Sequence, residues 1–108
     1  MSMPYIETYR FIFHQEDDMH IVQTLRLEAS TASGQSWGEV NGGGPVEHGT
    51  DPKEVLRRLV KQVISNEAPI KAGSLVVEVI GAGSVISRDE ASRVIVLAGL
   101  TPVEWRYL

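Results

Sequence analysis

The chain has 108 residues, of which 43% are hydrophobic and 22% are charged, and its mean hydropathy is −0.06. A chain of this length and composition forms one globular domain, so we expect a single α+β domain over residues 1–108. Ten Lys and Arg against fourteen Asp and Glu give a net charge of −4, which disfavours nucleic-acid binding through overall charge. The absence of cysteine excludes disulfides, thiolate zinc sites and thiol nucleophiles.

The opening segment MSMPYIETYR lacks the apolar core of a signal peptide. Nowhere in the sequence does an apolar run approach the roughly 18 residues that identify a membrane-spanning helix. These two observations predict a cytoplasmic protein that makes no membrane contact.

Two alternating segments open the chain and predict a long antiparallel hairpin. In residues 5–14 the buried face is formed by Tyr5, Tyr9, Phe11 and Phe13, with Glu7 as its only polar member. After an acidic tip at residues 15–18, the apolar set of residues 20–30 is Ile21, Leu25, Leu27 and Ala29. We expect Leu27 to face the main helix. A weaker third strand is predicted over residues 35–40, with Trp37 at one end of the sheet.

The main helix is predicted over residues 51–66, because Asp51 can cap it, Pro52 suits its first turn and Pro69 follows its end. Its apolar stripe consists of Val55, Leu56, Leu59, Val60, Val63 and Ile64, which we expect to pack on a sheet. Its opposite side carries a basic ridge of Lys53, Arg57, Arg58 and Lys61.

Residues 74–81 predict a strand, and Ser87 and Gly99 bound a predicted short helix over residues 88–98. Residues 93–98 also suit a strand, and residues 101–108 suit either a strand, which we favour, or a helix. The predicted fold is α+β, with a two-layer antiparallel sheet of four or five strands packed by the main helix and the short helix.

Two glycine-containing motifs resemble functional motifs, one of a hydrolase and one of a dinucleotide-binding loop. Neither has the neighbouring sequence that the function requires. Residues 34–38 match G-x-S-x-G, the motif of a hydrolase serine, but no helix follows Ser36. Residues 81–86 sit between a strand and a helix, as a dinucleotide-binding loop does, but Ile86 replaces the third glycine. We therefore predict a turn and a strand-to-helix connection, with no catalytic residues and no cofactor.

Histidines give the sequence a weak metal signal. His14 and His20 flank the acidic tip, a combination that transition metals favour, but their spacing matches no known zinc signature. His48 lies in a Gly- and Pro-containing loop without nearby ligands. We expect no tightly bound metal.

The leading functional hypothesis is a non-enzymatic binding module that docks on a larger macromolecule, as an inhibitor, adaptor or assembly subunit. Phage inhibitors and immunity proteins resemble it in size and charge alone. The predicted partner-binding residues are the basic ridge, with Trp37, Trp105 and Tyr107 as apolar anchors or core. A sheet with two semi-apolar faces favours a protein partner or a homo-oligomer.

Two alternatives stay open at this point. The first is a small enzyme or ligand-binding domain that uses His14, His20, His48 and the Gly-rich loops. The second is a nucleic-acid binder that uses the basic ridge.

Overall fold

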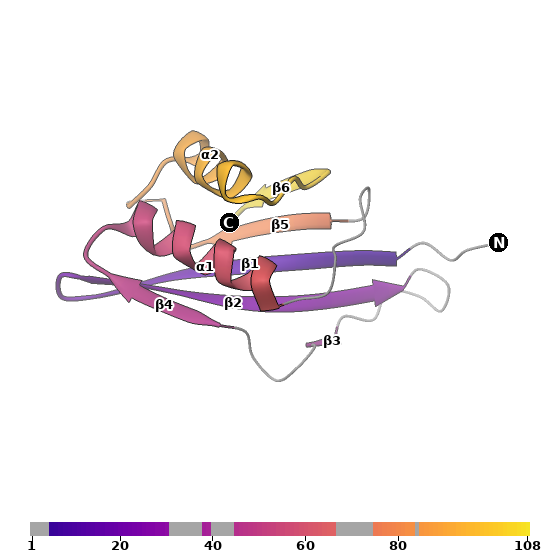
Figure 1. The fold of residues 1–108 in the computed structure, drawn as a ribbon, viewed down its shortest axis with the longest axis horizontal. Helices are drawn as coiled ribbons and strands as arrows, with labels where there is room; N and C mark the ends of the chain where they lie inside the picture. The colour runs from indigo at the N-terminus through magenta and orange to yellow at the C-terminus, as the bar shows by residue number, and fades with distance from the viewer. Residues whose placement is uncertain (1–4, 31–37, 40–44, 67–74, 84) are drawn as a thin grey trace.

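A computed structural model describes residues 5–30, 38–39, 45–66, 75–83 and 85–108 (Figure 1). Its elements in chain order are β1 (Tyr5–Glu16), β2 (Met19–Ser30), β3 (Gly38–Glu39), β4 (Val46–Gly49), α1 (Pro52–Asn66), β5 (Leu75–Ile80), α2 (Arg88–Ala98) and β6 (Glu104–Tyr107). The six strands form one sheet in the order β3-β2-β1-β5-β6, and β4 pairs with β2 on the same side as β3. The two helices pack on this sheet, which confirms the α+β class.

The strands β1 and β2 form the long antiparallel hairpin that the sequence predicts. A two-residue turn joins them, and Asp17 in this turn has a φ of 52°, a left-handed conformation that aspartate tolerates better than most residues. The short turn sets the register, so that Phe11 pairs with Thr24 and Phe13 pairs with Val22. The aromatic face of β1 is buried as expected, since Phe11 and Phe13 are 0% and 8% exposed.

The same register reverses the predicted faces of β2. Val22 and Thr24 lie beneath the helices and are almost fully buried, whereas Ile21 and Leu25 are partly buried on the opposite face. The expectation that the more apolar set faces the main helix is therefore wrong, because the hairpin turn decides which set of side chains turns inward. The side chain of Leu27 lies outside the described residues.

The sheet is mixed, whereas the sequence predicted antiparallel pairing throughout. β5 runs parallel to both of its neighbours, β1 and β6. The physical reason is the position of the helices, since α1 precedes β5 and α2 connects β5 to β6. A helix between two strands returns the chain to the end of the sheet where the previous strand began, so the next strand runs parallel to it. This arrangement brings the carboxyl ends of β5 and β6 to one end of the sheet.

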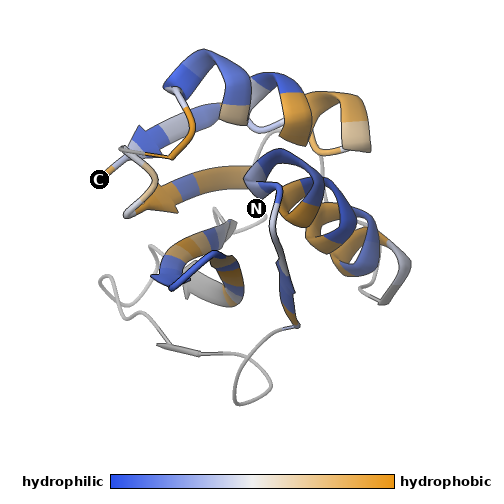
Figure 2. Cartoon of the chain, turned by 90° about the vertical axis from the view of Figure 1, so that its left-hand side faces the viewer, coloured by the Kyte–Doolittle hydropathy of each residue, from blue (hydrophilic) through white to orange (hydrophobic). Residues whose placement is uncertain are grey.

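Both helices pack on the same face of the sheet, as the end-on view in Figure 2 shows. The apolar stripe of α1 is completely buried at five of the six predicted positions: Val55, Leu56, Leu59, Val60 and Val63. The sixth residue, Ile64, is 39% exposed because it lies at the edge of the stripe, beside Gly99 at the end of α2. α2 contributes Ala91 and Ile95 to the same core. Below, the face that α1 and α2 leave uncovered is called the outer face.

Local capping explains where the helices begin and end. The backbone N–H of Lys53 donates to the Asp51 carboxylate at 3.1 Å, and that of Glu90 donates to the Ser87 hydroxyl at 3.1 Å. Gly99 ends α2 with a φ of 123°. Residues 93–98 are therefore helical, and the preferred strand for the tail is confirmed as β6.

The segment between β2 and α1 differs from the prediction in one respect. The described part of the third strand is Gly38–Glu39, and the rest of the predicted strand, Trp37 included, lies outside the described residues. The predicted loop at residues 41–50 includes β4, which pairs with β2 opposite residues 20–23. No alternation in the sequence predicts β4. Its four residues form a strand because they pair with the exposed edge of β2. Among the described residues, no helix is long and apolar enough to cross a membrane.

Candidate functional site

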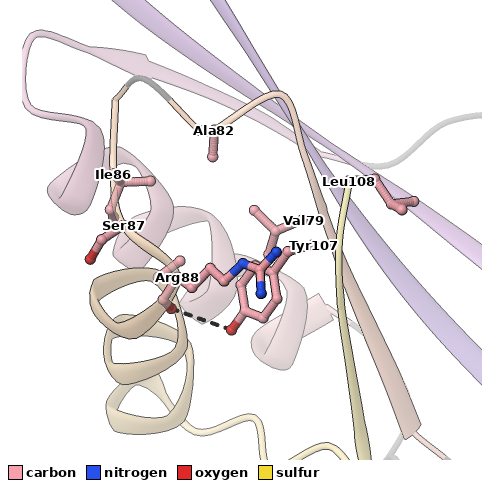
Figure 3. Close-up of a pocket in the computed structure, with 9 residues that line it drawn as sticks. Val79, Ala82, Ile86, Ser87, Arg88, Tyr107 and Leu108 are labelled. Atoms are coloured by element: carbon pink, nitrogen blue, oxygen red, sulfur yellow. Dashed lines mark hydrogen bonds between the residues drawn. The ribbon is translucent and has the colours of Figure 1, made fainter.

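A cavity of about 290 Å³ lies where the carboxyl ends of β5 and β6 meet the start of α2 (Figure 3). Its wall is largely apolar and includes Val79, Ala82, Ile86 and Ala91. The loop after β5 turns at Gly81, whose φ is 78° and whose absent Cβ would lie 2.9 Å from the backbone oxygen of Phe13. Glycine is therefore required there by conformation and by space.

Ser87, Arg88 and Tyr107 are the residues with polar side chains that line this cavity. The Arg88 guanidinium lies 5.4 Å from the centre of the Tyr107 ring, and the Tyr107 hydroxyl donates to the Arg88 carbonyl at 3.3 Å. The Tyr107 hydroxyl also forms a hydrogen bond with Ser92. Burial, followed by the negative charge of Asp89, raises the pKa of Tyr107 above its ordinary value of 10.0. The phenol therefore keeps its proton at neutral pH and packs against the core.

The glycine loop before α2 does not suit a phosphate group. Ile86, which stands where a dinucleotide-binding loop has its third glycine, is 5% exposed and packs in the core. Asp89 and Glu90 occupy the first turn of α2, where their negative charge opposes an anion. The geometry agrees with the predicted role of this loop as a connection between β5 and α2.

The predicted basic ridge on α1 is partly neutralised by carboxylates. Lys53 forms an ion pair with Glu90 of α2, and Arg57 binds Glu54 through two nitrogens, with Nε at 2.8 Å. The hydrogen bond from Arg57 lowers the pKa of the Glu54 carboxyl, and the one from Lys53 lowers the pKa of the Glu90 carboxyl. These pairs leave less positive charge for a partner than the sequence suggests.

The other two residues of the ridge are exposed, and among the described residues only the side chain of Arg58 bonds to another element. Arg58 donates to the backbone oxygen of His48 at 3.1 Å, so it holds α1 to β4. No carboxylate of the described residues pairs with the Lys61 ammonium, which points to solvent. Lys61 is therefore the ridge residue best placed for an electrostatic contact.

The hairpin register puts the two histidines of the acidic tip at positions on opposite faces of the sheet, and both border a small pocket of about 80 Å³ beside Gly81. His14 pairs with Ile21 on the outer face, whereas His20 pairs with Gln15 on the face that carries the helices. His14 instead lies beside Glu16, with 3.5 Å between Nε2 and Oε1. Within the part of the chain that the structure describes, no three His, Cys, Asp or Glu side chains gather in a way that would hold a metal.

The outer face contains a second and larger hollow, with a volume of about 410 Å³, between the tip of the hairpin and β4. Met19, Ile21 and Val46 give it an apolar lining, and Val46 is 50% exposed. Glu16 and Asp17 lie at its border, as does His48. We call this hollow the tip groove. It combines an apolar floor with an acidic rim.

Side-chain exposure on the outer face increases along β1 toward the tip groove. Thr8 is fully buried, Arg10 and Ile12 are partly buried, and His14 is exposed. Ile12 is in register with Ile80 of β5, so aliphatic surface continues across the sheet. Along β1, the outer face is therefore most open at the hairpin tip.

The predicted anchors Trp105 and Tyr107 lie together on β6. Their rings are nearly parallel, at 11°, with 6.1 Å between ring centres, and both are partly buried against the core. They therefore serve mainly as packing, the alternative that the sequence left open. The sequence analysis did not predict the tip groove. Its only signal in the sequence was Met19 and Ile21 beside the acidic turn, because the third apolar residue, Val46, lay in a predicted loop.

No protein-family model and no curated protein matches this sequence. The function is therefore inferred from the geometry of the sites.

Proposed function

We propose that this chain is a non-catalytic protein-binding module of the cytoplasm that docks through the tip groove. Its partner presents an apolar side chain flanked by Lys or Arg. The apolar side chain enters the hollow of about 410 Å³, and the cationic groups lie against Glu16 and Asp17. The single observation that carries this proposal is the combination of an apolar floor and an acidic rim on the face without helices.

The size and exposure of the groove support the proposal. A volume of about 410 Å³ falls within the range in which pockets take one large side chain or a small ligand. Val46 is 50% exposed, so the groove has apolar surface that a partner can remove from water. Burying such surface drives association, while the acidic rim selects partners by charge.

The basic ridge gives weaker support for docking. Two of its four cations are paired with Glu54 and Glu90, and a phosphate or carboxylate partner would have to displace those carboxylates. Nucleic-acid binding is disfavoured for the same reason and because the net charge is −4. Docking of a protein at the tip groove does not require the displacement of these carboxylates.

A random-peptide display selection on the immobilised protein tests the proposal. We expect the selected peptides to share an apolar residue next to Lys or Arg, and to lose at least about tenfold in affinity for Val46→Asp. Glu16→Lys should weaken the same peptides, because it reverses a charge of the rim at an exposed position outside the Asp17 turn conformation.

The matched control is Lys61→Glu, which reverses an exposed charge on the basic ridge. It should leave the selected peptides bound. Acidic peptides that lose binding with Lys61→Glu and keep it with Val46→Asp would assign docking to the ridge and refute the proposal.

A further inference from the structure

We infer that β6 is the interface of a symmetric dimer, in which two copies of this chain pair their β6 strands antiparallel and join their sheets. This inference is independent of the tip groove, which lies near β4 toward the other edge of the sheet. Among the described strands, β6 pairs only with β5, so its other side is a free edge. A free edge presents unpaired backbone groups to another strand.

Glu104 and Arg106 form an ion pair within each chain, and Arg106 also contacts Glu78 of β5. In addition to these contacts, the charges of β6 are self-complementary in one antiparallel register. In an antiparallel pairing centred on Trp105, Glu104 of each copy lies opposite Arg106 of the other. The two-fold axis repeats this contact, so the interface contains two such pairs. A shift of this symmetric register by one residue toward either end places Glu104 opposite Glu104, or Arg106 opposite Arg106. Of these three registers, only the central one avoids contact between like charges.

The backbone directions of β6 agree with this register. The N–H of Leu108 donates to the oxygen of Val79 at 2.9 Å, so the backbone groups of Leu108 point toward β5. Because these directions alternate along a strand, Arg106 and Glu104 also bond toward β5, and Trp105 presents its N–H and C=O to the free edge. Trp105 would then exchange two hydrogen bonds with Trp105 of the second copy. Glu104 and Arg106 would form the closer, non-hydrogen-bonded pairs, which suits contact between their side chains.

The position of α2 also suits this pairing. α2 packs over β5 and β6, where Ser92 bonds to Tyr107 of β6. Neighbouring strands lie about 4.8 Å apart, so a helix above the gap between β5 and β6 would be about 10 Å from its symmetry mate. Helices pack at about this spacing. Val96 follows Ser92 by one helical turn, on the same side of α2, and is 44% exposed, so it would be covered by the second α2.

Cysteine cross-linking tests the register directly, because the chain has no cysteine of its own. We expect a mixture of Glu104→Cys and Arg106→Cys chains to form an intermolecular disulfide on mild oxidation. Each variant alone should not, since identical positions would lie two residues apart along the paired strands, beyond the reach of a disulfide. Equal cross-linking in the mixture and in the single variants, or none in the mixture, would overturn the inference.

Light scattering tests the dimer without cysteine. The wild-type chain should have twice the monomer mass of 11.9 kDa. Glu104→Arg makes the edge wholly basic and should weaken the dimer at least about tenfold. A monomeric wild-type chain, or a dimer that Glu104→Arg leaves unchanged, would contradict the β6 interface.

Discussion

Arg10 and Glu78 lie opposite each other in the parallel β1–β5 ladder, and the Arg10 Nε donates to the Glu78 carboxylate at 3.0 Å. The Glu78 side chain is only 7% exposed, and a second cation, Arg106 of β6, lies 3.6 Å from its other oxygen. The carboxylate therefore ties three neighbouring strands together from the outer face. A buried carboxylate is stable only while such partners satisfy it.

Arg10→Ala should lower the free energy of unfolding by about 1–3 kcal/mol, because it leaves the buried Glu78 carboxylate with only its more distant partner. Urea denaturation measures the loss. Arg106→Ala is the matched comparison and should cost less, since its contact with Glu78 is longer, at 3.6 Å against 3.0 Å. Equal losses for the two variants would show that the two cations support Glu78 to the same extent.

Leu59→Ala should destabilise the fold by about 2–5 kcal/mol, because Leu59 is 0% exposed at the centre of the α1 stripe and its truncation leaves a cavity. Ile64→Ala, at a position that is 39% exposed, removes less buried surface and should cost less. The denaturant midpoints of the two variants measure the two losses of stability. A loss for Ile64→Ala as large as that for Leu59→Ala would mean that the edge of the stripe is as tightly packed as its centre.

Gly81→Ala should destabilise the protein by about 1–3 kcal/mol, since it forces a side chain into a φ of 78° and places a Cβ 2.9 Å from the Phe13 oxygen. Gly83 lies in the same loop, and a Cβ there would meet no atom within 4 Å. Gly83→Ala should therefore leave the thermal midpoint almost unchanged. If both variants melted alike, the requirement for glycine at position 81 would be refuted.

Acid should weaken an ion pair within α1 and the ion pair that joins α1 to α2. The folded pKa values of Glu54 and Glu90 are lowered below 4.5, by hydrogen bonds from Arg57 and Lys53 respectively. A lowered folded pKa means that the stabilisation is complete above about pH 4.5 and is lost as the pH falls through the lowered values. Thermal midpoints across this range measure the loss. The double variant Glu54→Gln/Glu90→Gln should show a shallower dependence on pH, and an identical dependence would contradict these assignments.

Much of the fold was predictable because its signals are local. The helix boundaries follow from Asp51, Ser87 and Gly99, whose side chains or conformations act on backbone groups a few residues away. The hairpin follows from alternation and an acidic turn in the same stretch of sequence. The four residues of the basic ridge lie on α1 as predicted, because their spacing is local to one helix, and their role in binding stays a prediction.

Tertiary structure decided the features that depend on distant segments. Val22 and Thr24 face the core because the turn at Asp17 sets the register between β1 and β2. From the sequence of β2 alone, the more apolar set of side chains was expected to face the core. The charge of the basic ridge is reduced by Glu90, which only the packing of α2 on α1 brings to Lys53. The tip groove likewise joins β2 to β4. Composition and periodicity record what a segment can bury, whereas pairing between remote segments determines which surface is left open.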